Sequence, residues 1–471
     1  MELYERLPCL DAHHTKQAEL TNMKQTISRY ILVVSLLISG TAVAADNKAI
    51  GHLLFELPFL GGNQRACATC HVDKDHFALL PEHVAVTPLS DPLFRRIDAD
   101  DPSAAQPTYD HLRAGLVRIT IPLAPNIDEI DTNGNVITNA TRTIAVWRGV
   151  PTIENTAMTA PFQYDGRAPN YAVQAAGALS LHQQISYPVQ PKLLDFIGDF
   201  EASVFSSYAV KLTAEKLAHG QHPADPALAL VFPPNSDEAA GQIIFKQACA
   251  LCHGGATGNT ITSQAAHDET FFQTNPDGTA VFGPQGPVLL GTHQDDPFMN
   301  IGTSGFSYFT QPGTGPVFGV PPIITALTII DSFPDHNTLS LPHYRFRFYT
   351  DATRTAKLVD LPPLPSQGLS PSILPQAYTT DPGRAVISGD PVDYEAFKVP
   401  QLRGLARTAP YFHDGSMKTL DDIVEFYSSR VLFFIPSAGF PPINPPLSPN
   451  GLPECFSPQQ KRQLIAFLKQ M

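Results

Sequence analysis

Apolar residues recur at helical spacing in three parts of the chain, and each part predicts a helix. Gly51 and Phe55 in AIGHLLF are four residues apart, as are Gly241 and Phe245 in AAGQIIFKQACALCH. Residues with this spacing share one helical face, where a glycine allows another helix to approach closely. The third helix is predicted in FSPQQKRQLIAFLKQM, at the end of the sequence.

The terminal segment carries the signals of a helix start. Ser457 is placed to cap the helix, Pro458 suits its first turn, and Gln460 can close a capping box with Ser457. The apolar positions that follow form one stripe, at Leu464, Ile465 and Leu468. Cys455, just before this helix, is expected to be a buried or free thiol.

The N-terminal region predicts a secretory signal sequence. Lys24 and Arg29 precede an apolar run over residues 30–38, and the small residues 42–44 follow. The alternative is a membrane anchor, but the run is shorter than the about 20 residues that span a bilayer. The polar residues before Met23 are unusual ahead of a signal, which suggests that translation begins at Met23. We assign residues 1–45 to an N-terminal extension and signal peptide, and expect an exported mature chain without membrane spans.

Composition narrows the possible partners and the domain organisation. The formal net charge of −13 argues against nucleic acid or anionic lipid, which both need clustered Lys and Arg. Charged residues make up only 16% of the sequence, while its 45 prolines are about twice the average share. We therefore expect compact domains joined by long, stiff connections. With 471 residues the chain exceeds the usual size of one hydrophobic core, so two domains are expected.

Four of the six cysteines stand in two C-x-x-C-H motifs, which comprise Cys67, Cys70 and His71, and Cys249, Cys252 and His253. Disulfide pairing gives no role to the histidines, and the two motifs lie too far apart in sequence for a typical zinc ribbon. Covalent haem explains all six residues, because two thiols attach the porphyrin and the neighbouring imidazole binds its iron. We expect two c-type haems, with disulfides or zinc as the alternatives.

A second pair of segments indicates an internal repeat. GVPTIENTAMTAPFQYDGRAPN begins at Gly149, and KVPQLRGLARTAPYFHDGSMKT begins at Lys398. Matching residues, such as Pro161 and Pro410, are 249 positions apart. The turn alone has a structural explanation, since Pro stiffens it, Asp accepts backbone N–H groups and Gly adopts positive φ. Its association with both haem motifs indicates duplication of a module that carries one haem.

With these motifs the chain resembles the bacterial di-haem cytochrome c peroxidase family, which includes the methylamine-utilisation enzyme MauG. The similarity rests on both C-x-x-C-H motifs, APFQYDGRAPN, the segment from DPGRAV to IVEFY and the terminal helix. Residues 83–140 and 256–375 have no recognisable counterpart. The resemblance implies a mainly α fold of two cytochrome c-like domains with long irregular loops, which we place at residues 46–234 and 235–471. It also implies a periplasmic location.

The resemblance implies the iron ligands as well. His71 and His253 correspond to the proximal ligands of the first, peroxide-reactive haem and the second, electron-transfer haem. The family's distal ligand of the second haem lies fourteen positions after the histidine of F-H-D-G, which leads to Tyr427. Tyr at this position is a feature of MauG, and a phenolate favours higher iron oxidation states than the Met of peroxidases. The alternative is that Tyr427 belongs to the core and that the iron ligand is Met417 or Met299.

Around the first haem the chain departs from the family pattern. Tyr164 stands where the family has a Trp between the haems, and it can form a radical only by losing a proton. The family's distal Glu corresponds to Gln184, which cannot act as an acid or base. His182 is the nearest residue that could, with a helix-surface or iron-ligating role as the alternative. Further candidates for the sixth iron ligand are His76 and His83.

Calcium is a further cofactor that the resemblance implies. The family often binds it through backbone oxygens that correspond to those of Thr408 and Pro410. Its Asn ligand corresponds to Gly149, so one of the hard oxygen ligands that calcium needs is missing.

Three functions are compatible with these features. The first is reduction of hydrogen peroxide with electrons from a small cytochrome or copper protein, for which a basic partner would suit the acidic chain. The second is a MauG-like oxidation of Trp or Tyr residues in a partner protein. The third is electron transfer without catalysis.

Overall fold

The computed structural model describes residues 46–259, 340–361, 378–428 and 455–471, and the strand residues 282–283, 286–287, 298–299, 310–311 and 315–316. The predicted signal segment lies outside this part of the chain. The chain divides into two compact units, residues 1–69 with 171–203, and residues 70–170 with 204–471. These units do not coincide with the domains proposed at 46–234 and 235–471, which stay a prediction. Within the described ranges, no helix has the length and apolar character needed to cross a membrane.

The first unit is built from helices. They are α2 (Asn47–Glu56), α5 (Tyr171–Leu181) and α6 (Pro191–Glu201), with the 3-10 turn η1 (Cys67–Thr69). A Cβ atom at Gly51 would overlap the carbonyl oxygen of Phe196, so only glycine allows α2 and α6 to approach this closely. The ring of Phe55, one turn later, lies 5.1 Å from that of Phe200. The predicted first helix and its glycine contact are confirmed.

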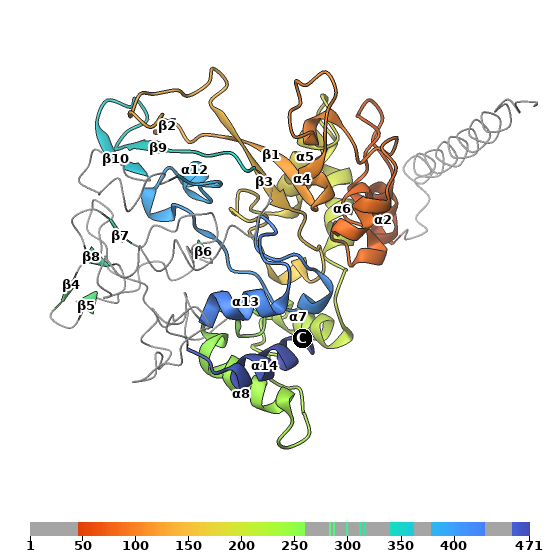
Figure 1. The fold of residues 1–471 in the computed structure, drawn as a ribbon. Coiled ribbons are helices and arrows are strands. Elements are labelled where there is room, and N and C mark those ends of the chain that lie inside the picture. The colour runs from red at the N-terminus through yellow and green to blue at the C-terminus, as the bar shows by residue number, and fades with distance from the viewer. Residues whose placement is uncertain are drawn as a thin grey trace, which may run out of the picture. The chain divides into compact units, whose positions relative to one another are not determined.

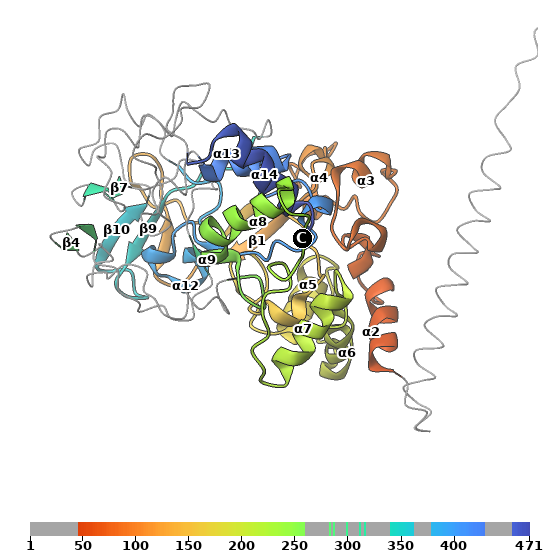
Figure 2. The same ribbon diagram turned by 90° about the horizontal axis from the view of Figure 1, so that it is seen from below.

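In the second unit, α8 (Asp237–Ala248), α13 (Leu420–Phe426) and α14 (Pro458–Leu468) lie side by side in both ribbon views (Figures 1 and 2). A Cβ atom at Gly241 would overlap the carbonyl oxygen of Gln463. The rings of Phe245 and Phe467 lie 5.2 Å apart beside this contact. The predicted close approach at Gly241 is therefore confirmed, and α14 is the partner helix.

The start of α14 has the predicted caps. The Ser457 side chain accepts a hydrogen bond from the backbone of Gln460, whose side chain accepts one from the backbone of Ser457. The stripe of Leu464, Ile465 and Leu468 is buried in the core between the helices. Cys455 is buried, as expected.

A second core of this unit is made by strands, which the sequence analysis did not anticipate. β1 (Leu116–Pro122) and β3 (Thr143–Gly149) pair antiparallel in continuous register. β10 (Lys357–Leu361), β9 (Phe346–Tyr349) and β2 (Ile127–Glu129) form a three-stranded sheet, seen in Figure 1. Apolar side chains of these strands form one buried cluster. The expectation of a mainly α chain is therefore confirmed only for the regions around the helices named above.

The other elements of the second unit are short. The helices are α3 (Pro81–Val86), α4 (Asp110–Arg113), α7 (Tyr208–Ala218), α9 (Ala250–His253) and α12 (Ala385–Ser388). The 3-10 turns are η2 (Asp73–Asp75), η3 (Arg96–Asp98), η4 (Thr156–Met158), η6 (Pro391–Asp393) and η7 (Leu405–Arg407). The strands are β4 (Phe282–Gly283), β5 (Gly286–Pro287), β6 (Phe298–Met299), β7 (Thr310–Gln311), β8 (Gly315–Pro316) and β11 (Phe397–Lys398).

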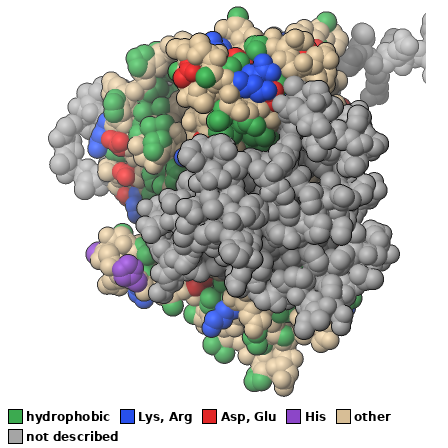
Figure 3. Space-filling model, turned by 90° about the vertical axis from the view of Figure 1, so that its left-hand side faces the viewer, with side chains coloured by type: hydrophobic (Ala, Val, Ile, Leu, Met, Phe, Trp, Pro, Cys, Tyr) green, Lys and Arg blue, Asp and Glu red, His purple; other side chains and the backbone are tan. Residues whose placement is uncertain are grey.

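Figure 3 shows one face of the molecule, on which part of the described residues can be seen. Acidic, basic and apolar side chains of the described residues are interspersed there, without a continuous basic area. This distribution agrees with the net charge of −13.

Candidate functional site

The second C-x-x-C-H motif lies where α8 meets α9. The backbone N–H of Cys249 donates to Phe245, and that of His253 donates to Cys249 at 2.9 Å, so the chain stays helical through the motif. Residues three and four positions apart then share one face, which brings both sulfurs and the imidazole together. Both cysteines are free thiols, and burial raises the pKa of Cys249 to about 12 and that of Cys252 to about 11.

Backbone carbonyl groups orient the imidazoles of both motifs. The Nδ1 atom of His253 lies 2.8 Å from the carbonyl oxygen of Pro400, and that of His71 lies 2.9 Å from the carbonyl oxygen of Phe77. The backbone of Pro151, which is equivalent to Pro400 in the repeat, also forms a hydrogen bond with His71 and raises its pKa. Burial lowers the pKa of both imidazoles, which favours their neutral form. An Nδ1–H that donates to a carbonyl leaves the Nε2 lone pair available for a metal.

The structure brings Tyr427 to the second motif. Its ring lies 6.4 Å from the ring of His253, at an angle of 78°. Burial raises the pKa of its phenol, and the two cysteines of the motif raise it further. Met417 is buried in the same helical core, and the side chain of Met299 lies outside the described residues. Iron ligation by Tyr427 stays a prediction.

Near the first motif, the residue that reaches a cysteine is Gln183, which the sequence analysis missed. Its side chain is buried, with Nε2 3.7 Å from the sulfur of Cys67. The chain turns after α5, with a positive φ of 57° at Gln184, so a helical pattern could not predict which side chain faces inward. Gln184 is exposed and accepts a hydrogen bond from Asn63, whose amide also donates to the His182 carbonyl. The catalytic roles of His182 and Gln184 stay predictions.

The other two candidate histidines of this region each contact a carboxylate through Nδ1. His76 lies 3.3 Å from Glu154, and His83 lies 2.9 Å from Asp75. Such contacts fix the orientation of an imidazole. Ligation of the first iron by either residue stays a prediction.

The two repeated turns have the same backbone structure. Phe162 pairs with Ala168 in the first, and Tyr411 pairs with Met417 in the second, each with an N–H···O distance of 2.7 Å. The short 3-10 turns η4 and η7, which precede them, are also equivalent in the repeat. The repeat predicted from the sequence is therefore confirmed at the level of local structure.

The two turns also exchange backbone hydrogen bonds. The N–H of Gly149 donates to the carbonyl of His413 at 2.7 Å. The N–H of Lys398 donates to the carbonyl of Tyr164 at 2.8 Å. Because Gly149 is equivalent to Lys398, and Tyr164 to His413, these two bonds are copies of one another. The second unit thus contains a local pseudo-twofold arrangement in which each turn holds the other.

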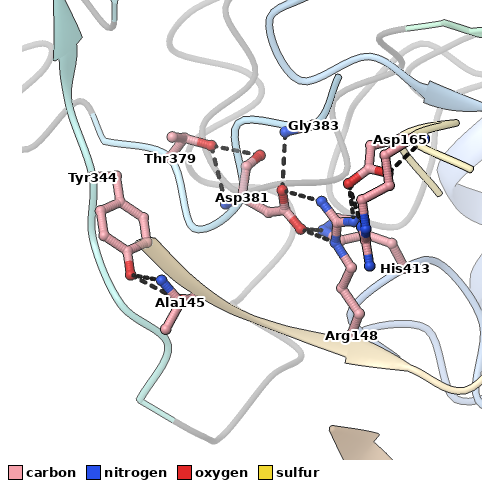
Figure 4. Close-up of polar contacts among 9 residues, drawn as sticks. Ala145, Arg148, Asp165, Tyr344, Thr379, Asp381, Gly383 and His413 are labelled. Atoms are coloured by element: carbon pink, nitrogen blue, oxygen red, sulfur yellow. Dashed lines mark hydrogen bonds and ion pairs between the residues drawn. The ribbon is translucent and has the colours of Figure 1, made fainter. Parts of the chain in front are cut away.

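Arg148, the last residue but one of β3, lies at the centre of a buried ion-pair network (Figure 4). Its guanidinium lies 2.6 Å from Asp165 of the first turn and 2.6 Å from Asp381. Burial alone would lower the pKa of Arg148, but the two carboxylates raise it above its ordinary value. The backbone N–H of Gly383 donates to Asp381 at 2.9 Å. The ion pairs of Arg148 thereby join strand β3 to the first turn and to the segment before α12.

Tyr164 and His413 lie beside this network. Their rings are 6.3 Å apart at 72°, and Phe397 stacks on the His413 ring at 4.0 Å. The Nε2 atom of His413 lies 4.0 Å from the carboxylate of Asp381. Burial raises the pKa of Tyr164 to about 12, so the phenol keeps its proton at neutral pH.

The predicted calcium site has a weak donor set. No side-chain oxygen is available at Gly149, whose backbone N–H is already bonded to His413. In the part of the chain that the structure describes, no group of three or more His, Cys, Asp or Glu residues could hold a metal. Carboxylates are the usual main ligands of calcium, so the carbonyl oxygens of Thr408 and Pro410 would need water or other partners. Calcium stays a prediction.

The donor sets of both motifs fit haem c. Each motif supplies two cysteines, Cys67 and Cys70 in the first and Cys249 and Cys252 in the second. Each motif ends in an imidazole whose pKa burial lowers, whose Nδ1 contacts a backbone carbonyl and whose Nε2 could bind iron. A structural zinc site would need four such ligands together, and no cluster of that kind is found among the described residues.

Comparison with known proteins agrees with this reading of the motifs. Residues 236–294 match the family model of the cbb3-type cytochrome c oxidase subunit III. A cytochrome c peroxidase, IdrP2 of Denitromonas iodatirespirans, is 40% identical over 90 residues, which cover 19% of this chain and 21% of that protein. The cytochrome c551 peroxidase of Nitrosomonas europaea is 49% identical over 43 residues, 9% of this chain and 13% of that one. The chain thus matches only about a fifth or less of the length of these relatives.

Two solved structures resemble the chain over most of its length. One is a MauG-like protein associated with microbial copper homeostasis, with a TM-score of 0.39 at 16% identity, covering 90% of this chain and 89% of that one. The other is the diheme peroxidase BthA from Burkholderia thailandensis, with a TM-score of 0.35 at 15% identity, covering 90% and 85%. Both TM-scores are below 0.5, too low to establish a shared fold. From its motifs and matched segments, the chain contains a cytochrome c domain and is similar in part to the cytochrome c peroxidases.

Proposed function

We propose that the chain is a periplasmic di-haem c-type cytochrome that reduces hydrogen peroxide with electrons from a small redox protein. The observation that carries the proposal is that both C-x-x-C-H motifs combine two cysteines with a histidine whose Nδ1 lies within hydrogen-bond distance of a backbone carbonyl. Partial similarity to cytochrome c peroxidases supports it.

Haem c, when bound, supplies iron that exchanges single electrons, so two haems match the two electrons that peroxide needs. Peroxide takes up two electrons and two protons and leaves as two water molecules. The protein holds the reacting groups and moves the protons. His71 and His253 would each offer Nε2 to an iron, while the backbone carbonyls keep the rings in place.

Tyr164 is the proposed relay for electrons between the haems. It is half-buried beside His413, and backbone hydrogen bonds join its turn to the second repeat. A tyrosine passes an electron on only if its phenolic proton leaves with it. Because its pKa is raised to about 12, the proton stays in place until oxidation. Tyr164→Phe is therefore expected to slow peroxide turnover while both haems remain attached.

His182 is the proposed proton donor to peroxide, with Gln184 as a neutral hydrogen-bond partner. His182→Ala should slow peroxide reduction by about a hundredfold, the usual lower contribution of a general acid or base. Normal turnover in this variant would assign the histidine to structure, and Gln184→Ala would be examined next.

A second candidate is MauG-like oxidation of Trp or Tyr residues in a partner protein. The position of Tyr427 beside His253 favours it, because an anionic oxygen ligand stabilises the more oxidised iron. Mass spectrometry of co-expressed partner proteins after peroxide treatment would detect the added oxygen or cross-link that this activity predicts.

The net charge of the protein indicates the kind of redox donor that it uses. A net charge of −13 favours a basic donor, whose reaction rate should fall as salt concentration rises.

Calcium held by the carbonyl groups of Thr408 and Pro410 is the least supported of the proposed cofactors. Treatment with a calcium chelator, followed by restoration with Ca²⁺, would measure its contribution to peroxide turnover.

The main test is steady-state peroxide reduction by the purified, haem-loaded protein with a reduced small cytochrome or copper protein. We expect two donor molecules to be oxidised for each peroxide consumed. The variant that lacks Cys249 and Cys252 should lose this activity, whereas Lys211→Met, which changes an exposed side chain, should retain it. Donor oxidation without peroxide consumption would instead assign the chain to the non-enzymatic electron carriers.

A further inference from the structure

Lys398 is a half-buried cation for which the sequence suggests no role. It ends strand β11, and its side chain enters the first repeated turn rather than solvent. Burial lowers its pKa to about 8, and no carboxylate of the described residues offsets that shift. Burying an ammonium group is costly unless hydrogen bonds replace its water, so its contacts need an explanation.

The ammonium of Lys398 contacts two backbone carbonyl groups of the first turn. Its Nζ atom donates to the carbonyl oxygen of Pro161 at 2.6 Å, and also to the carbonyl oxygen of Thr159. The same Nζ lies 5.9 Å from the centre of the Phe162 ring. Hydrogen bonds from a charged donor are about twice as strong as neutral ones, so together these contacts form a strong attachment.

The backbone of Lys398 holds the same turn from a second point. Its N–H donates to the carbonyl of Tyr164 at 2.8 Å. One residue therefore fixes the main chain at Thr159 and Pro161, before Tyr164, and at Tyr164 itself. Movement of the Tyr164 backbone would have to break contacts with both the main chain and the side chain of Lys398.

The internal repeat shows that this arrangement is not symmetric. The equivalent of Lys398 is Gly149, and the equivalents of the Thr159 and Pro161 carbonyls are those of Thr408 and Pro410. The backbone bond is present in both copies, since Gly149 donates to His413 as Lys398 donates to Tyr164. Among the described residues, a cationic side chain is seen on the carbonyl pair only in the copy that holds Tyr164.

We propose that Lys398 acts as a tethered cation for the carbonyl pair of Thr159 and Pro161, and is the positioning residue for Tyr164. The relay role of Tyr164 rests on the proposed function, whereas occupation of the carbonyl pair by a cation does not. In Lys398→Gly, both copies of the repeat have glycine at this position, as the first copy has at Gly149. It also leaves space for a free alkylammonium ion to replace the lost side chain.

The experiment uses the haem-loaded full chain and n-butylammonium, which matches the deleted side chain. The unfolding midpoint of Lys398→Gly should rise saturably with n-butylammonium, as expected for a ligand that binds the folded state. Tetramethylammonium, which has no N–H group, should not produce the rise. The matched control is Lys418→Gly, because Lys418 also donates to a turn carbonyl, that of Gly415 at 2.6 Å, but to a single one. The control should show no saturable response.

The positioning role is measured by the tyrosyl radical that forms after addition of hydrogen peroxide, identified by its absence in Tyr164→Phe. We expect its yield to fall about tenfold or more in Lys398→Gly, since small displacements of a reacting group have effects of that size or larger. n-Butylammonium should restore the signal. Lys398→Arg, which keeps the charge and the N–H donors, should retain more of it than Lys398→Met, and this pair decides the question if Lys398→Gly does not fold.

The outcomes separate the two proposals. Equal radical yields in wild type, Lys398→Gly and Lys398→Met, with no saturable effect of n-butylammonium, would overturn the role of Lys398 and leave the proposed function standing. A saturable effect of n-butylammonium in a protein that never forms a Tyr164 radical would support the tethered cation. That same result would remove the relay from the proposed function.

Discussion

Arg148→Met tests whether buried charge holds the first turn in place. The substitution keeps an apolar stem of similar length but removes the cation that contacts Asp165 and Asp381, both at 2.6 Å. These three side chains are at most 3% exposed, so water cannot replace the lost partner. Breaking a buried ion pair of this kind costs about 3–5 kcal/mol.

The structure places the expected loss near the lower end of this range. Asp165 keeps a second cation, because Arg167 lies 2.6 Å from the same carboxylate. Asp381 keeps the backbone N–H of Gly383, and its remaining ion-pair partner is His413 at 4.0 Å, whose pKa burial lowers, so that its cationic form is disfavoured. The uncompensated charge is therefore mainly that of Asp381. We expect Arg148→Met to lose about 3 kcal/mol of folding free energy at neutral pH.

The loss should depend on pH in a defined direction. Burial alone would raise the pKa of Asp165, but Arg148 and Arg167 hold it below its ordinary value. A carboxyl group with a pKa lowered by folding stabilises the protein above its unfolded pKa, and this stabilisation disappears as pH falls through the folded pKa. The difference between wild type and Arg148→Met should therefore shrink below about pH 4, the ordinary value for Asp.

The assay is denaturant unfolding of both haem-loaded proteins from pH 7 to pH 3, with Lys211→Met as the control. Lys211 lies 3.9 Å from Glu215, and both side chains are about half exposed, so this pair should contribute only about 0.3–0.5 kcal/mol. A loss in Arg148→Met no larger than in the control would refute the reasoning. A loss that stays constant down to pH 3 would mean that packing, rather than charge, is responsible.

Three other changes have defined outcomes. Gly241→Ala should destabilise the protein by about 1–3 kcal/mol because its Cβ would overlap the backbone of α14, whereas Gly177→Ala, with nothing within 4 Å, should be neutral or stabilising in thermal unfolding. Replacement of Cys249 and Cys252 by Ala should remove one covalent haem and leave the other, and unchanged haem mass in mass spectrometry would exclude attachment there. Tyr427→Met should raise the reduction potential of one haem in a redox titration, since a neutral thioether stabilises reduced iron, and an unchanged potential would make Tyr427 a core residue.

Sequence alone was sufficient where the relevant residues are close together in the chain. The C-x-x-C-H motifs indicate haem attachment from sequence alone, because their spacing along the chain keeps two thiols and an imidazole close together. The helix start at Ser457 and the close contact at Gly241 were likewise predicted correctly. Each depends on local backbone geometry, which a few neighbouring residues determine.

The limits appear where a turn or a strand decides the environment. His182 and Gln184 were chosen by counting along the sequence, but the backbone turns after α5 and directs Gln183 towards Cys67 instead. The strand core around β1 and β9 was also missed, and one of its pairings, between β2 and β9, joins segments more than two hundred residues apart along the chain. Pairing of such distant segments leaves little trace in the local pattern of either one.

The sequence by itself determined that the chain repeats a turn and carries two haem motifs. Only the tertiary structure showed which charged side chains contact the repeated turns. Arg148 in an apolar strand and Lys398 beside K-V-P resemble ordinary surface residues in sequence, yet one lies between two buried carboxylates and the other between two carbonyls. The physical reason is that a buried charge is stable only when opposite charges or dipoles surround it. Folding brings those partners from segments up to 239 residues away.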